Sequence, residues 1–168
     1  FINNRTLTIT SDIFVGNDTD DDNGFTNSAG AVLNVVNLNF NDGDFDFFNS
    51  GTINQSGNFS GISTGDTNVD NLAGGVWNWT LTPNTTFDAN IATVMNLTAV
   101  SNTFNYSAAG AQRIIPTSYN NITLSNSGAK DANNASFSVS GNWLVSGTAT
   151  FTEGTGTVTL NGTTAQTI

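Results

Sequence analysis

Short runs of alternating apolar residues restrict the fold of this sequence more than any other feature. The runs place Val, Ile, Leu, Phe or Trp at every second residue, and Gly, Asn, Asp or Ser separates one run from the next. A period of two is typical of strands that bury one face. Residues 89–100 also allow a helix, but their β-branched residues favour a strand. The expected strands are 5–10, 12–15, 31–40, 45–48, 76–81, 89–100, 121–125, 136–140, 142–147, 148–152 and 157–160.

The composition agrees with an all-β chain. About half of the 168 residues are Asn, Thr, Ser or Gly, which are poor helix formers. Thr suits strands, whereas Asn, Ser and Gly suit turns. The sequence contains no cysteine, so backbone ladders and packing must hold the fold together. Asn side chains that stack in successive layers can also form amide ladders.

Two internal echoes indicate a repeat protein. Residues 103–114 resemble residues 157–168, 54 positions later, and share an Ala-Gln-x-Ile motif that is not made of the enriched residue types. Within residues 1–61, residues 1–7 resemble residues 47–53, and each run reaches a glycine soon afterwards. Composition alone explains the second echo more easily than the first. Residues 1–168 are therefore expected to be a single repeat segment of a longer chain.

Repeats of this length with short strands predict a right-handed parallel β-helix, or β-solenoid. In this fold each coil buries the apolar face of its neighbour. Coils of roughly 20–27 residues would place two coils in each echo. The alternative is a β-sandwich, which also has strands every 8–12 residues or so.

The stretches "YNNITLSNSG", "VSGNWLVSGTATFTEGTGTVTLNGTTAQTI" and "FFNSGTI" resemble repeats of very large secreted surface proteins of Bacteroidetes. The resemblance covers residues 103–168 best and residues 1–61 less well. It implies an adhesin-like β-helical chain at the cell surface, similar to exported substrates of type IX secretion. It implies no catalytic residues.

Residues 16–25, "GNDTDDDNGF", are a candidate Ca²⁺ loop. Asp18, Asp20 and Asp22 alternate ahead of Gly24, as oxygen ligands do in loops that wrap calcium. The pattern is not an EF-hand, because an extra residue precedes the glycine and Ala29 stands where the closing Glu would be. The alternative is a solvated acidic turn.

Asp42, Asp44 and Asp46 form a second acidic set, which a strand would place on one face. They could complete a metal site with the first set. The alternative is an acidic outer face opposite buried Phe45 and Phe47.

Trp77 and Trp79 are the candidate ligand-binding residues, because two indoles on one strand face could stack on a sugar. The alternative is that they belong to the core with Leu81, since burying an aromatic side chain is worth several kcal/mol. The same alternative applies to Trp143.

Thr-x-Thr runs raise the hypothesis of an ice-binding face, which requires the threonines to stack in register across coils. The runs are 6–10, 148–152 and 155–159. The alternative is that Thr simply suits a solvated strand face.

The charge balance argues against several function classes. Asp and Glu number 13 against three cations, Arg5, Arg113 and Lys130, for a net charge of −10. Such a chain has too few cations to neutralise the phosphates of a nucleic acid or to bind an anionic membrane surface, so neither is an expected partner. No apolar run is long enough for a transmembrane helix, so membrane insertion is not expected. Without His or Cys, we do not expect an enzyme.

The sequence thus predicts a structural, adhesive segment of an extracellular surface protein, a stiff rod with a polar face. The expected partners are surface glycans or other cell-surface proteins. Its terminal coils expose strand edges, which predicts end-to-end self-association. Alternatives are a carbohydrate-binding sandwich module and, further away, a glycan-active β-helix enzyme or an ice-binding solenoid.

Overall fold

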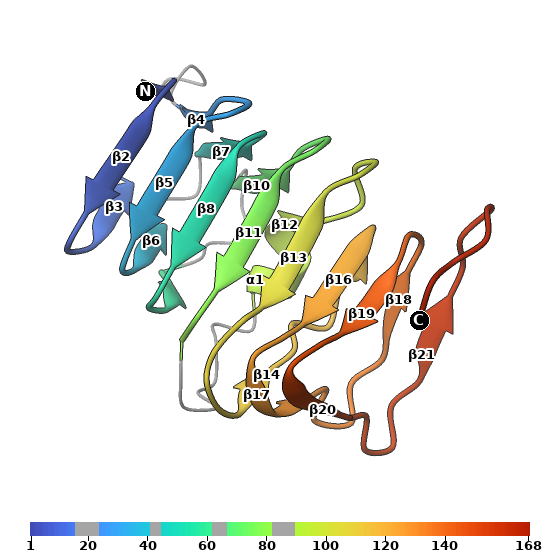
Figure 1. Ribbon diagram of the computed structural model, residues 1–168. Coiled ribbons are helices and arrows are strands. Elements are labelled where there is room, and N and C mark those ends of the chain that lie inside the picture. The colour runs from blue at the N-terminus through green and yellow to red at the C-terminus, as the bar shows by residue number, and fades with distance from the viewer. Residues whose placement is uncertain (16–23, 41–44, 62–66, 82–89) are drawn as a thin grey trace.

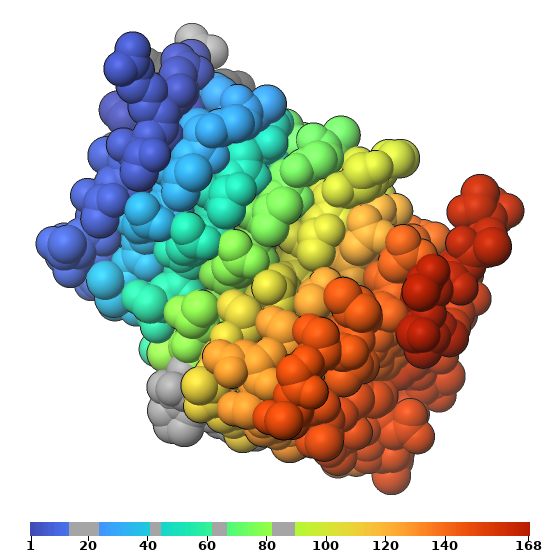
Figure 2. All heavy atoms as spheres, in the orientation of Figure 1, coloured from blue at the N-terminus to red at the C-terminus, as the bar shows by residue number. Residues whose placement is uncertain are grey.

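The chain folds as a β-solenoid, as predicted, and not as a sandwich (Figure 1). The computed structural model describes residues 1–15, 24–40, 45–61, 67–81 and 90–168. Within these residues, neighbouring strands of every sheet pair in parallel and come from successive coils. Parallel pairing of this kind follows from a chain that winds repeatedly in one direction. The bands of colour in Figure 2 follow the coils from one end of the molecule to the other.

The described strands form five sheets, here called A to E. Sheet A contains β1 (Ile2–Asn3), β4 (Gly24–Asn27), β7 (Asp46–Asn49), β10 (Asn68–Asn71) and β12 (Met95–Asn96). Sheet B contains β2 (Thr6–Ile9), β5 (Val32–Val35), β8 (Thr52–Gln55), β11 (Val76–Trp79), β13 (Thr103–Tyr106), β16 (Asn121–Leu124) and β19 (Trp143–Val145). Sheet C contains β3 (Ile13–Val15), β6 (Leu38–Phe40) and β9 (Phe59–Ser60). Sheet D contains β15 (Ser118–Tyr119), β18 (Phe137–Val139) and β21 (Val158–Leu160), and sheet E contains β14 (Gln112–Arg113), β17 (Ser127–Asp131) and β20 (Thr148–Thr152).

Sheet B runs along most of the molecule, whereas the other faces change partway. A parallel bridge between Leu97 and Tyr119 continues the line of sheet A into sheet D. Steps between paired residues of sheet B range from 18 residues, Thr103 to Asn121, to 27 residues, Val76 to Thr103. The predicted coil length of roughly 20–27 residues is therefore close to the observed one. In the described part of the chain, no helix is long and apolar enough to cross a membrane.

The echo within residues 1–61 is a true register repeat. Thr6 pairs with Val32, which pairs with Thr52, so the echoed threonines lie two coils apart on one face. Asn3 and Asn49 are related in the same way through Asn27. The echo that composition explains more easily is thus the one that follows the coils.

The other echo is not a register repeat. Residues 103–106 form β13 in sheet B, whereas 158–160 form β21 in sheet D. The two segments share a local turn instead. The backbone N–H of Ala108 donates to Oε1 of Gln112 at 2.9 Å, and that of Gly162 donates to Oε1 of Gln166 at 3.0 Å. The Ala-Gln motif therefore marks one kind of corner at two different places in the coil.

Residues 89–100 do not form the predicted strand. The described part begins with one helical turn, α1 (Ile91–Val94), and becomes extended only at β12. Ile91 and Met95 lie four residues apart and are both buried. This spacing puts both side chains on one side of a helical turn, which outweighs the β-branched residues between them.

The interior combines an apolar core with a column of buried amides. Stacked and tilted rings of Phe25, Phe47, Trp77 and Phe104 follow one another at centroid distances of 5.0 to 6.0 Å. Beside them lies the inner ladder, defined as Asn3, Asn27, Asn49 and Asn71.

The inner ladder occupies the corner between sheets A and B. In the first three members, Nδ2 donates to Oδ1 of the next asparagine at 2.7 to 2.8 Å. Each Nδ2 also donates to the carbonyl oxygen of a residue that begins a strand of sheet B, Val32, Thr52, Val76 or Thr103. The predicted amide ladder is confirmed, and it ties successive coils together inside the core.

Candidate functional site

Trp77 and Trp79 belong to the core, so the prediction of a sugar-stacking platform is wrong. Their side chains are 0 % and 2 % exposed and point inward from β11. Nε1 of Trp77 donates to Oε1 of Gln55 at 3.0 Å, and Nε1 of Trp79 donates to the carbonyl oxygen of Gly57 at 2.8 Å. Trp143 is also buried. Both indoles of β11 have their polar edge satisfied inside the fold, and neither face reaches a ligand.

The proposed calcium loop lies outside the described residues. This holds for Asp18, Asp20 and Asp22, and for Asp42 and Asp44 of the second set. Of the second set, the structure places Asp46 on the outer face of β7, where its Oδ1 accepts a hydrogen bond from Nδ2 of Asn68 at 2.8 Å. Among the described residues, no group of three or more His, Cys, Asp or Glu side chains could hold a metal. Calcium binding stays a prediction.

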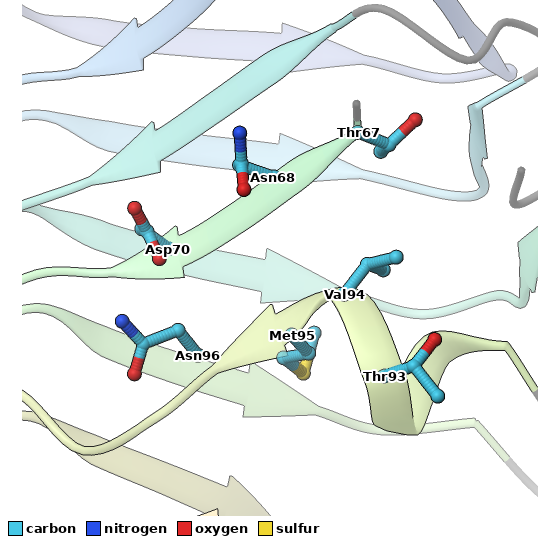
Figure 3. A pocket seen from close by; sticks show the side chains of 7 residues that line it. All are labelled: Thr67, Asn68, Asp70, Thr93, Val94, Met95 and Asn96. Atoms are coloured by element: carbon cyan, nitrogen blue, oxygen red, sulfur yellow. The ribbon is translucent and has the colours of Figure 1, made fainter. Parts of the chain in front are cut away.

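A hollow of about 560 Å³ opens on the outer face of sheet A, between β10 and α1 (Figure 3). β12 pairs with β10 only at Val69–Met95 and Asp70–Asn96, because the chain before Met95 turns into α1. The helical turn therefore replaces a strand neighbour beside the start of β10 and leaves the hollow. Its lining residues are Thr67, Asn68, Asp70, Thr93, Val94, Met95 and Asn96.

Asp70 is the ionisable group among the described residues that line the hollow. Burial raises the pKa of its carboxyl, a hydrogen bond with the Asn96 side chain partly offsets this, and the nearby charge of Asp46 raises the pKa further. Oδ1 of Asn96 in turn accepts hydrogen bonds from N and Oγ1 of Thr98, at 3.2 and 2.7 Å. The hollow therefore presents a carboxylate whose position is fixed by a chain of polar contacts.

Sequence reasoning did not single out the hollow. Its carboxylate and amides come from "NVD" (68–70) and "VMN" (94–96), which lie a coil apart. One sequence pattern could have indicated it: Asn68 and Asp70, which point outward, alternate with Val69, which points inward. Only the register of β10 and β12 brings the two segments together.

A second ladder of amides lies on the outer face of sheet B. We call it the outer ladder, defined as Asn34, Asn54, Asn78 and Asn105. Nδ2 of Asn54 donates to Oδ1 of Asn34, Nδ2 of Asn78 to Oδ1 of Asn54, and Nδ2 of Asn105 to Oδ1 of Asn78, at 2.8 to 3.1 Å. These residues are half-buried, unlike the inner ladder. This face is regular and polar over several coils.

The Thr-x-Thr runs do not stack on one another, which contradicts the arrangement that ice binding requires. Thr6 and Thr8 lie on β2 in sheet B, Thr148–Thr152 form β20 in sheet E, and Thr159 lies on β21 in sheet D. In sheet B the position of Thr8 is taken by asparagine in the next coils. Each run simply occupies a strand of a different face.

Lys130, the single lysine, lies inside a corner and not on the surface. Its Nζ donates to the carbonyl oxygens of Ala108 and Gly110 and to Oε1 of Gln112, at 2.9 to 3.0 Å. Burial lowers the pKa of its ammonium group to about 8. The three acceptors hold the Nζ group in place at the turn between β13 and β14.

No family model, curated protein or solved structure matches this chain.

Proposed function

We propose that the chain is a structural and adhesive segment of an extracellular bacterial surface protein. Its coils build a stiff rod, and its outer faces contact surface glycans or other cell-surface proteins. The observation that carries the proposal is the inner ladder, in which buried amides link four successive coils. The resemblance to Bacteroidetes surface repeats supports the location outside the cell.

The inner ladder suits a load-bearing role. Separating two coils along the rod breaks the parallel backbone ladders on several faces together with one amide contact of the ladder. Each buried donor or acceptor left without a partner costs about 1–3 kcal/mol. Because these contacts must break together, the coils resist separation better than single surface contacts would.

The hollow beside β10 is the candidate contact for a glycan. A carboxylate and amides accept and donate hydrogen bonds to the hydroxyl groups of a sugar, as fixed polar groups do in ligand sites. Asp70 and Asn96 are already held in place, so little conformational entropy is lost when a ligand binds. Val94, which is half-buried, supplies an apolar contact against which the C–H face of a sugar ring can rest.

Adhesion to immobilised glycans tests the proposal. The 168-residue chain is passed over surfaces coated with a panel of neutral and amino oligosaccharides. We expect retention on at least one surface and a loss of about tenfold or more in affinity for Asp70→Ala and Asn96→Ala. Ser138→Ala, on the outer face of β18, is the control and keeps the affinity. The glycan proposal fails if no surface retains the chain, or if Asp70→Ala binds as the unmodified chain does.

Calcium and end-to-end association belong to the same proposal. If the Asp18–Asp22 loop binds Ca²⁺, the melting temperature of the chain rises in millimolar Ca²⁺ relative to chelator. An unchanged melting temperature favours the alternative, a solvated acidic turn.

Apolar side chains are exposed at both ends of the solenoid, among them Phe1, Leu160 and Ile168. We expect Leu160→Asp to weaken any head-to-tail stacking of isolated segments, since open strand edges are templates for pairing.

A further inference from the structure

The outer face of sheet B carries no charge in the part of the chain that the structure describes. This is unusual for a chain with a net charge of −10. The strands alternate inward and outward side chains, and sheet B is turned toward the viewer in Figure 1. The outward residues are Thr6, Thr8, Val32, Asn34, Thr52, Asn54, Val76, Asn78, Thr103, Asn105, Asn121, Thr123 and Leu144.

These residues form two straight rows. Thr6, Val32, Thr52, Val76 and Thr103 are paired in register and alternate Thr with Val. The outer ladder runs beside them. A side-chain amide has two N–H groups and two acceptor lone pairs on its oxygen. The ladder uses one N–H and one lone pair of Asn54 and of Asn78, so donors and acceptors remain at a repeat of about 4.8 Å, the strand spacing.

We propose that the outer face of sheet B is an interface for a second copy of this chain, packed face to face. The repeat of the rows is set by backbone pairing, so a partner with another repeat drifts out of register within a few coils. A second copy has the same repeat along the whole face, as paired sheets of identical segments do. A two-fold arrangement also makes the contact self-complementary and closed.

The charge distribution favours the same partner. Two copies with a charge of −10 each repel one another through their charged faces. Screening limits this repulsion to about 8 Å at physiological ionic strength. The described acidic side chains, such as Asp46 and Asp70 on sheet A, project from other faces. Copies that meet through sheet B therefore bring only neutral side chains together.

The size of the face predicts a weak complex. Seven strands at about 4.8 Å, each about 13 Å long, cover roughly 400 Å² per copy. Two copies together bury about 800 Å², less than the roughly 1,200 Å² of the smallest stable interfaces. We therefore expect a dissociation constant between about 10 µM and 1 mM. This inference does not depend on glycan binding at the hollow.

Sedimentation equilibrium of the 168-residue chain, from 10 µM to 1 mM in 150 mM salt, tests the interface. The unmodified chain is expected to shift toward dimer across this range. Asn78 lies on β11, the middle strand of sheet B, so Asn78→Lys and Asn78→Asp each place like charges in the centre of the contact. Each variant alone is expected to remain monomeric, and an equimolar mixture of the two is expected to dimerise again.

The mixture distinguishes a lost interface from a misfolded chain, because only folded partners with opposite charges restore the dimer. Ser138→Lys, on sheet D, carries the same charge away from the face and is expected to dimerise normally. Leu160→Asp, at the end of the solenoid, is also expected to dimerise, which separates this contact from end-to-end stacking. A monomer at 1 mM, or Asn78→Lys that associates like the unmodified chain, overturns the proposal. The proposal is also overturned if the unmodified chain is monomeric and binds a neutral glycan that the Asn78→Lys variant does not bind. The outer face of sheet B would then bind sugars rather than a second copy.

Discussion

Asn27 donates a hydrogen bond from Nδ2 to Oδ1 of Asn49 at 2.8 Å, one coil further along the chain, and both side chains are fully buried. A buried amide is costly unless its donors and acceptors are paired. The same contact repeats in the neighbouring coils, so every member of the inner ladder depends on the coil beside it. This dependence makes the ladder a device that fixes the register of the stack.

Asn49→Ala should be one of the most destabilising single substitutions in the chain. It removes the donor to Asn71 and Val76 and the acceptor for Asn27 and Gly51. Leaving buried groups unpaired costs about 1–3 kcal/mol each, so we expect a loss of about 3 kcal/mol or more in the free energy of unfolding. Urea denaturation measures it.

Asn54→Ala is the matched control for this substitution. Asn54 occupies the outer ladder in the same coil, where water can replace the lost contacts. We expect a loss below about 1 kcal/mol. Equal losses for Asn49→Ala and Asn54→Ala would show that the inner ladder does not hold the stack.

Lys130→Met is expected to destabilise the fold by about 2 kcal/mol or more. Without the ammonium group, the carbonyl oxygens of Ala108 and Gly110 and Oε1 of Gln112 lose a donor. Arg5→Met removes the same charge from an exposed side chain and should change the free energy of unfolding by less than about 0.5 kcal/mol. A Lys130→Met variant as stable as Arg5→Met would refute the role of the buried Nζ hydrogen bonds.

Stability should rise with pH between about 8 and 10. Burial lowers the pKa of Lys130 to about 8, against 10.5 for an ordinary lysine. In this window the folded chain has released a proton that the unfolded chain still holds, so the free energy of unfolding increases with pH. Denaturation at a series of pH values should show this rise in the unmodified chain and lack it in Lys130→Met. The same slope of stability against pH in both chains would contradict the assignment of the rise to Lys130.

Above about pH 10 the trend should reverse. Burial raises the pKa values of Tyr106 and Tyr119, whose hydroxyl oxygens lie 2.7 Å apart, above the ordinary 10.0. The unfolded chain then loses phenolic protons that the folded chain keeps, so stability falls as pH rises. Tyr106→Phe should reduce the slope of this fall, although it also costs the hydrogen bond from the backbone N–H of Ile115. An unchanged slope would show that the titration of Tyr106 does not cause the fall in stability.

Iodide should quench the tryptophan fluorescence of the folded chain only weakly. Trp77, Trp79 and Trp143 are at most 7 % exposed. Quenching should increase several-fold when the chain is unfolded in urea, as buried indoles become accessible. Strong quenching of the folded chain would contradict the burial of the indoles. A change of emission on adding soluble glycans to the Asp70→Ala variant would also contradict it, because the indoles would then lie at a ligand site on the surface.

The fold class could be predicted from the sequence because apolar alternation is visible in strands such as β5 and β11. Three of the strands that were not predicted share a cause. In β4 and β10, an inward position is taken by Asn27 and Asn71, and in β17 by Lys130. A buried polar residue interrupts the alternation of apolar residues, so this alternation does not predict the strand. The residues that hide these strands are the ones that bind one coil to the next.

The site was harder to predict than the fold. Trp77 and Trp79 drew attention because large aromatic residues serve both cores and ligand sites, and only the inward direction of β11 decides between them. Asp70 and Asn96 belong to different coils, and their contact exists only because the register of β10 and β12 pairs them. Register across coils, rather than any local motif, creates both the hollow and the outer ladder.

Hydrogen exchange of the asparagine side-chain amides, followed by NMR, tests the central claim most directly. The two ladders provide an internal comparison, since Asn49 and Asn54 lie in the same coil. Buried, hydrogen-bonded groups exchange only when the structure opens. We predict that the Nδ2 hydrogens of Asn27 and Asn49 exchange as slowly as the backbone amides of β8 and β11, whereas those of Asn54 and Asn78 exchange rapidly. Inner-ladder amides that exchange as fast as the outer ones would contradict the account of a stack held by buried asparagines.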